Sequence, residues 1–221
     1  MIRSLFSIQL VAAMCTVLTA QGDGDAAEKA RQERRTVEAL RSLSLAEVKK
    51  MEAVFQDQLG NGLQVLQDTP ANADTEAAAK IRKQLAPWAS VFPQRFIDLI
   101  VKSGEQPDLR AHLVDTLTLA ASAEAATGLA KLIGSDDEYL DMICVQGIGF
   151  ISAAADDARK AIVELAGTTK SGKIMGATLI AMARLGCPEA AAIARATIGG
   201  DAHSPEVKAR AVSALAITQD D

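Results

Sequence analysis

Apolar residues in the C-terminal half of the chain recur at the three- and four-residue spacing that is typical of amphipathic helices. The pattern also repeats over a longer distance. Three Ala-rich segments, each opening on an acid and closing on glycine, start 33 and 32 residues apart. A period of this length predicts stacked helix pairs, since one pair cannot bury its apolar face alone. The three segments are Glu124–Gly134, Asp157–Gly167 and Glu189–Gly199.

Each of these segments is predicted to be the second helix of a pair. Ser135 opens the sequence Ser-Asp-Asp-Glu, a capping box that predicts the start of a first helix. Ser204 and Pro205 predict another start, with serine at the cap and proline at the first helical position. No helix follows the last one in the sequence, so we expect it to close the C-terminal end. The first helices are predicted over 108–122, 135–152, 170–186 and 204–217.

The region before the repeats is also predicted to be helical. Ser44 and Glu47 form a capping box, and Gly60 and Gly62 are expected to end or break the helix that it opens. Pro87 is expected to mark the end of the next helix, because proline fits poorly inside one. The predicted elements are helices over 28–43, 44–59 and 75–86 and a loop over 68–74.

A short stretch after this region concentrates Trp88, Phe92 and Phe96, and Pro93 is predicted to lie in the first turn of a helix there. We expect these large side chains to form the core at the N-terminal end of the repeats, because such residues usually lie inside. An exposed binding patch is the alternative.

Composition also favours helices. Hydrophobic residues make up 49% of the 221 residues and aromatic residues only 3%, so alanine and leucine must build the core. Small side chains suit closely packed helices, whereas a sheet needs more β-branched and aromatic residues. The single tryptophan and the single tyrosine leave little material for stacking sugars or nucleobases.

The N-terminus has the pattern of an export signal. Arg3 supplies a positive charge, Leu5–Ala20 is an apolar run, and small residues permit cleavage after Gly22 or after Ala20. The run is short for a membrane span, which needs about 20 apolar residues. We therefore expect export to the periplasm or cell envelope, or secretion, with a membrane anchor only if the signal segment stays uncleaved.

Charge argues against nucleic acid as a partner. Removal of residues 1–22 leaves 22 basic and 28 acidic residues, a net charge of −6. No basic block remains that would neutralise a run of phosphates. The closest candidate lies within 29–35, where Lys and Arg are interleaved with Glu as on a solvated helix face.

Candidate chemistry is sparse. His112 is expected to be a packed or partly exposed helical residue, and His203 with Asp201 offers two metal ligands without a third. Cys144 and Cys187 predict either a disulfide or two small residues in the core and at a helix cap. No serine lies in the glycine frame of a nucleophile elbow. The sequence therefore indicates no enzyme, and we name no catalytic, cofactor-binding or metal-binding residue.

Acidic residues recur at predicted helix starts, where the positive end of the helix dipole favours a carboxylate. A calcium site or a catalytic carboxylate pair is the alternative interpretation. The segment Gly167–Lys173 lacks the residue order of a phosphate loop and is predicted to connect two helices. The recurring acids are Asp136, Asp137, Glu138, Asp141, Asp156, Asp157 and Glu189.

The helix pairs resemble HEAT repeats, in particular the short bacterial HEAT-like units also found in bilin lyases. Ser204–Ala216 carries the resemblance, with Pro205 early in the helix, Arg210 inside it and an Ala/Leu face. The resemblance covers Pro107–Thr218, and Gly147 and Gly149 depart from it. Glycine costs about 1 kcal/mol relative to alanine inside a helix, so we expect close helix packing or a kink there.

A HEAT-like fold implies an all-α, right-handed α-solenoid of stacked antiparallel helix pairs, here with an N-terminal helical arm. The domains expected are a signal peptide (1–22), the helical arm (23–86) and the HEAT-like repeat domain (87–221). Such folds usually bind proteins on a curved surface, and the resemblance implies no bilin chemistry. We therefore expect an exported, non-catalytic scaffold or adaptor without a cofactor. The alternatives are a metal-dependent factor near His203 and a carrier for an apolar ligand near Trp88.

Overall fold

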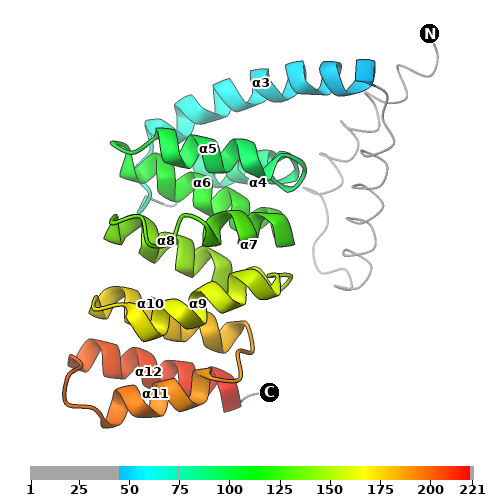
Figure 1. The fold of residues 1–221 in the computed structure, drawn as a ribbon. Helices are drawn as coiled ribbons and strands as arrows, with labels where there is room; N and C mark the ends of the chain where they lie inside the picture. Colours follow the sequence, from blue (N-terminus) through cyan, green and yellow to red (C-terminus); the bar gives the residue numbers. More distant parts are fainter. Residues whose placement is uncertain (1–44, 74, 220–221) are drawn as a thin grey trace.

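The computed structural model describes residues 45–73 and 75–219, and every regular element in these residues is an α-helix (Figure 1). The all-α fold class is therefore confirmed. The helices are α3 (Leu45–Gln67), α4 (Glu76–Val91), α5 (Pro93–Lys102), α6 (Pro107–Ala120), α7 (Ala123–Ala130), α8 (Glu138–Gly149), α9 (Asp156–Thr168), α10 (Gly172–Arg184), α11 (Ala190–Gly199) and α12 (Pro205–Gln219).

Alternate helices pack against one another. In the series α4, α6, α8, α10 and α12, each helix contacts the next, and α5, α7 and α9 form a second such series. Helix α11 packs on α10 and α12. Figure 1 shows the helix pairs following one another from α3 to the C-terminal end. A helix lies in each segment predicted as a first helix, namely α6, α8, α10 and α12, and in each segment predicted as a second helix, namely α7, α9 and α11, although α7 ends at Ala130 rather than Gly134.

Helix α8 lies close to both of its neighbours because of its two glycines. A Cβ atom on Gly147 would come within 2.7 Å of the Thr118 Oγ1 of α6. A Cβ atom on Gly149 would come within 2.8 Å of the Ala181 Cα of α10. The prediction of close helix packing is therefore confirmed. The glycines give α8 a poorer intrinsic helix propensity but allow contact distances that no larger residue permits.

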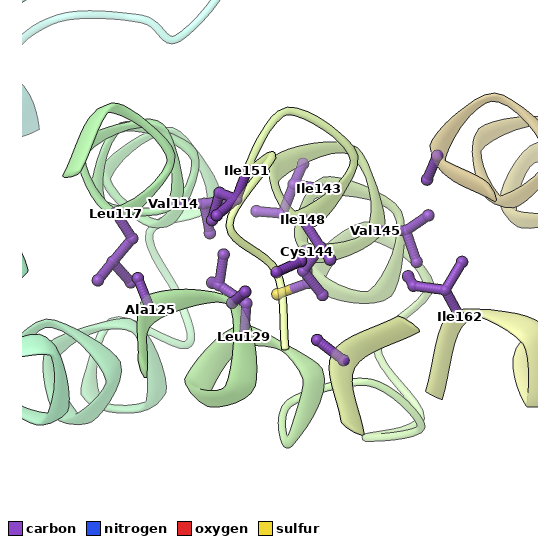
Figure 2. Packing of buried hydrophobic residues seen from close by; sticks show 14 of the residues in the cluster. Val114, Leu117, Ala125, Leu129, Ile143, Cys144, Val145, Ile148, Ile151 and Ile162 are labelled. Atoms are coloured by element: carbon purple, nitrogen blue, oxygen red, sulfur yellow. The ribbon is translucent and has the colours of Figure 1, made fainter. Parts of the chain in front are cut away.

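The core runs through the whole series of helices as one continuous cluster of buried apolar side chains. Figure 2 shows its central part, where Leu129 of α7, Ile148 of α8 and Ile162 of α9 are buried together with Cys144. Alanines such as Ala125 fill the narrower spaces. The expectation that small and aliphatic residues build the core is confirmed.

At the N-terminal end, Phe55 of α3 lies among the aromatic side chains of α4, of α5 and of Phe92 between them. Its ring centroid is 5.4 Å from that of Trp88, 5.5 Å from that of Phe92 and 6.0 Å from that of Phe96. The Trp88 Nε1–H donates a hydrogen bond of 2.8 Å to the Gln58 Oε1. The predicted core at this end is confirmed, and the aromatic side chains pack on one another.

Two predicted helix ends are wrong. Helix α3 continues through Gly60 and Gly62, because Gly62 lies against α4, where a Cβ atom would come within 3.1 Å of the Ile81 Cγ2. Helix α4 continues through Pro87. The neighbouring Trp88 is buried, and we attribute the continuity to this packing, which offsets the hydrogen bond that proline cannot donate.

The predicted cap at Ser135 is also wrong. Helix α8 begins later, and Asp137 caps it by accepting a hydrogen bond of 2.9 Å from the Leu140 N–H. Asp136 adopts a left-handed backbone with φ 62°, which is not helical. The helix therefore cannot begin directly after Ser135 and begins at Glu138 instead. Pro93 and Pro205 do occupy the first positions of α5 and α12, as predicted.

Some expectations lie outside the described residues or stay predictions. The signal peptide, the helix over 28–43 and the cap residue Ser44 fall outside the described part of the chain. The division at residues 86 and 87 stays a prediction, and α4 spans that position. None of the described helices has the length and apolar character needed to cross a bilayer.

Candidate functional site

The first helices share one register, which fixes the side of each helix that stays exposed. Val114 and Thr118 of α6 both lie against Gly147 of α8, and Gly149 lies against Ala181 of α10. These contacts place equivalent positions of α6, α8 and α10 side by side. A surface that we call the row face follows on their uncovered side. From this register we assign to it Asp108, Asp115, Leu119, Tyr139, Met142, Gln146, Phe150, Lys173, Ile180 and Arg184, of which Tyr139, Met142 and Ile180 are only partly exposed and also pack against the core.

The most exposed aromatic group on the row face is Phe150. Phe150 is the residue directly after the end of α8, and it is 61% exposed. The guanidinium carbon of Arg184, at the end of α10, lies 3.9 Å from the centre of the Phe150 ring. This distance is typical of a cation–π contact. Among the described residues no carboxylate forms an ion pair with Arg184, so its N–H groups are available to a partner.

Charge changes sign along the row face. On α6, Asp115 lies 3.4 Å from the Arg82 Nη1, and Asp108 lies near the Tyr139 phenol of α8. Burial, followed by the negative charge of Asp108, raises the pKa of the Tyr139 phenol. Helix α10 carries Lys173 and Arg184 and no acid. The row face therefore carries acidic side chains on α6, one of them paired with Arg82, and basic side chains on α10.

An ion pair between a buried arginine and a partly exposed aspartate joins α6 to α8. The Arg110 Nη1 lies 2.5 Å from the Asp137 Oδ2, and the Arg110 side chain is buried. The pKa of the Asp137 carboxyl is lowered, mainly by the hydrogen bond that it accepts from the Leu140 N–H and next by the hydrogen bond from the Arg110 guanidinium. The Arg110 Nε is buried and has no hydrogen-bond partner in the described residues. This pair fixes the spacing of the two helices.

A second polar contact joins α8 to α10. The Ser171 hydroxyl donates to the Glu138 carboxylate, and the Ser171 Oγ also accepts from the Ile174 N–H as the cap of α10. Together with the Arg110–Asp137 pair, this contact connects three successive first helices near their N-terminal ends. The row face therefore lies on helices whose relative positions are fixed by contacts.

His112 is fully buried, so of the two expected positions, packed or partly exposed, the packed one is correct. Its Nε2 lies 3.0 Å from the Thr69 carbonyl oxygen, and its Nδ1 lies 3.0 Å from the Arg82 Nη1. A carbonyl only accepts and a guanidinium only donates, so Nε2 carries the hydrogen and Nδ1 accepts. The histidine holds the loop after α3 against α6.

The structure places His203 and Asp201 in the turn between α11 and α12. No group of three His, Cys, Asp or Glu side chains in the described residues is arranged to hold a metal ion. The acids at helix starts have other roles. Asp137 is a cap, and Asp141 accepts a hydrogen bond of 2.9 Å from the Gly134 N–H. Asp156 lies in the first turn of α9, as the dipole argument predicts.

Cys144 and Cys187 are both buried free thiols, so the structure contains no disulfide between them. Burial raises the pKa of the Cys144 thiol to about 12 and also raises the pKa of Cys187. A thiol with a raised pKa is a poor nucleophile at neutral pH. The prediction of two small buried residues is therefore the correct alternative.

A shallow depression with a volume of about 310 Å³ lies between α5 and α7. Ile97 and Gly128 belong to its lining, to which Glu124 and Lys131 bring charges of both signs. A Cβ atom on Gly128 would come within 2.9 Å of the Ile97 Cγ1, so the two helices are already in close contact there. The depression offers no cluster of chemically active groups.

Phe150 and Arg184 were missed by sequence reasoning, although the sequence contains a signal for them. Each follows the first residue of its helix by the same number of residues, from Glu138 to Phe150 and from Gly172 to Arg184. An alignment of the first helices, in addition to the second helices, would have placed the two side chains next to each other. Their exposure and their stacking required the three-dimensional structure.

The comparisons with known proteins add no identification: no protein-family model matches the chain, and no curated protein matches it.

Proposed function

We propose that the protein is an exported, non-catalytic scaffold or adaptor that binds a protein partner, with its helix pairs arranged as a right-handed, HEAT-like α-solenoid. The contacts between alternate helices support this arrangement, since each pair shares its apolar surface with the next. The apolar run at Leu5–Ala20 supports export to the cell envelope.

The observation that carries the proposal is the exposed Phe150 ring with Arg184 stacked on it. Aromatic residues, Met and Arg are enriched where proteins bind one another, and Trp, Tyr and Arg dominate binding energies. The row face combines the exposed Phe150 and Arg184 with the partly exposed Tyr139 and Met142. This composition suits recognition of a protein better than chemistry on a small molecule.

Rigidity gives the proposed mechanism. Gly147 and Gly149 allow close contact of α6, α8 and α10, and the Arg110–Asp137 pair links α6 to α8. A surface whose backbone is already ordered loses little conformational entropy when a partner binds. The protein would therefore act by holding a fixed surface rather than by a conformational change.

Affinity capture tests the proposal. The full chain, expressed in its source cells with a C-terminal tag, would be recovered from the cell envelope and its bound proteins identified by mass spectrometry. We expect one saturable partner that untagged protein displaces. Recovery of the chain with no displaceable partner, together with stoichiometric metal or bound lipid, would favour the metal-dependent or carrier alternatives instead.

A further inference from the structure

The basic part of the row face has the features of a peptide-binding site, an inference that rests on the proposed function. We call this part the cationic platform and define it as Phe150, Lys173, Ile180 and Arg184. We propose that the cationic platform binds an acidic peptide segment of a partner protein. An apolar side chain of the peptide packs on Phe150 and Ile180, and a neighbouring carboxylate pairs with Arg184.

The first argument is charge. The whole chain has a net charge of −5, but Lys170, Lys173 and Arg184 lie within 170–184, a segment that contains no acid. Arg210 of α12 adds a further cation, because its side chain lies against Gly176 of α10. One acid, Glu138 of α8, lies at the N-terminal end of α10, where it accepts from the Ser171 hydroxyl, so the positive charge is least offset around Arg184. A local excess of positive charge on an acidic protein attracts anionic partners selectively.

The second argument is the state of Arg184. Stacking on Phe150 orders the guanidinium plane, and no carboxylate in the described residues pairs with it. A stacked guanidinium still presents its N–H edge, which fits a carboxylate with two parallel hydrogen bonds. Because the side chain is already ordered by the ring, binding costs less of its conformational entropy.

The third argument concerns the kind of anion. Phe150 is 61% exposed and Ile180 is half-buried, so the cation lies beside an apolar surface. A nucleic acid would require a longer basic stripe to neutralise successive phosphates. A peptide that offers carboxylates beside an apolar side chain matches both parts of the platform.

The length of the platform sets the size of the peptide. Lys173 and Arg184 lie near opposite ends of α10, which has 13 residues. At a rise of about 1.5 Å per helical residue they are about 16 Å apart along the axis. An extended peptide spans this distance with about five residues. We therefore expect two acids that flank an apolar centre over about five positions.

Selection from a phage-displayed library of 12-residue peptides against the full chain tests the inference. We expect the selected peptides to carry Asp or Glu close to Leu, Phe or Trp. A synthetic peptide from the selected set should bind at least about tenfold more weakly to Arg184→Glu and to Phe150→Ser, as expected for a residue at the centre of an interface. Its binding should also weaken as the salt concentration rises.

Val101→Ser is the matched control, because Val101 on α5 is 60% exposed and lies outside the platform. We expect this variant to bind the peptide as the wild type does. Circular dichroism at increasing temperature checks that all three variants remain folded. Peptides without acids, peptides that bind Arg184→Glu undiminished, or an unenriched library would overturn the inference. Self-association of the chain in sedimentation experiments, abolished in Phe150→Ser, would also overturn it, because a second copy would then occupy the platform.

The outcomes separate this inference from the proposed function. A partner that is captured equally by wild type, Arg184→Glu and Phe150→Ser would leave the scaffold function standing and overturn the platform. Failure of the wild type to capture any partner would count against the scaffold function itself.

Discussion

The Arg110–Asp137 pair shows how one side chain takes part in two structural contacts. Asp137 caps α8 through the Leu140 N–H and also neutralises the buried guanidinium of α6. Sequence reasoning predicted an acid at this helix start but assigned the cap to Ser135. The turn that carries Asp136 at φ 62° decides which residue reaches the helix end. Sequence alone does not fix that backbone geometry, because only a small fraction of residues other than glycine adopt a left-handed conformation, although aspartate does so more often than most.

The stability of the protein should depend on pH through Asp137. The folded state lowers the pKa of this carboxyl below its ordinary value of 3.8. The ionised carboxylate therefore stabilises the fold above about pH 3.8, and this contribution is lost as pH falls through the lower folded pKa. Asp137→Asn keeps a capping side chain but removes the charge, and should lower the free energy of unfolding by about 1 kcal/mol at neutral pH.

Urea unfolding followed by circular dichroism measures this difference at several pH values. The gap between wild type and Asp137→Asn should shrink below about pH 3.8, the ordinary value. A gap of constant size across the acidic range would mean that the charge of Asp137 contributes nothing to stability.

At the scale of helices, glycines at contacts should be sensitive to substitution and glycines in open positions should not. A Cβ atom on Gly149 would come within 2.8 Å of the backbone of α10, whereas no atom lies within 4 Å of one on Gly60. Gly149→Ala should lower the free energy of unfolding by about 1–3 kcal/mol through overpacking. Gly60→Ala should raise it by about 0.5–1 kcal/mol through helix propensity.

Thermal or urea unfolding of the two glycine variants checks this pair. Equal effects of the same sign in both variants would show that helix propensity, and not the distance between α8 and α10, controls the response.

The register of the first helices makes a second prediction. Val145 and Val212 lie at the same position of α8 and α12, but Val145 is fully buried and Val212 is 56% exposed. No helix in the described residues covers that side of α12. Val145→Asp should lower the free energy of unfolding by about 3–5 kcal/mol, because it buries an unpaired charge. Val212→Asp should change it by no more than about 0.5 kcal/mol.

Denaturant midpoints of the two valine variants provide the measurement. A large loss in Val212→Asp would show that this side of α12 is covered in solution, which contradicts its place at the open end of the series.

The sequence predicted most helices because their signals are local and repeated. Acids, glycines and prolines at fixed spacing marked the pairs from α6 to α12, and Pro93 marked α5. The errors fell at Gly62 and Pro87, where local preference favours a break. There, contacts between α3 and α4 maintain the helices, and such contacts between distant residues are invisible in a local pattern.

For the whole molecule, the sequence predicted repeated helix pairs but not the surface that they share. Burial of Trp88 and Cys144 follows from hydrophobicity, and both are buried. Phe150 has the same apolar character and is exposed. Only the helix register distinguishes the two cases, because it directs Phe150 to the uncovered side of α8. The row face is thus a property of the assembled helices and not of any single segment.

Site-specific photo-crosslinking in intact source cells tests the central claim most directly. A photoreactive phenylalanine analogue would replace Phe150 in the full chain, or Val101 as the equally exposed control. We predict one discrete adduct with another protein when the analogue stands at position 150, and none when it stands at position 101. No adduct at position 150, or the same adduct at both positions, would contradict the account of this protein as a scaffold that binds through its row face.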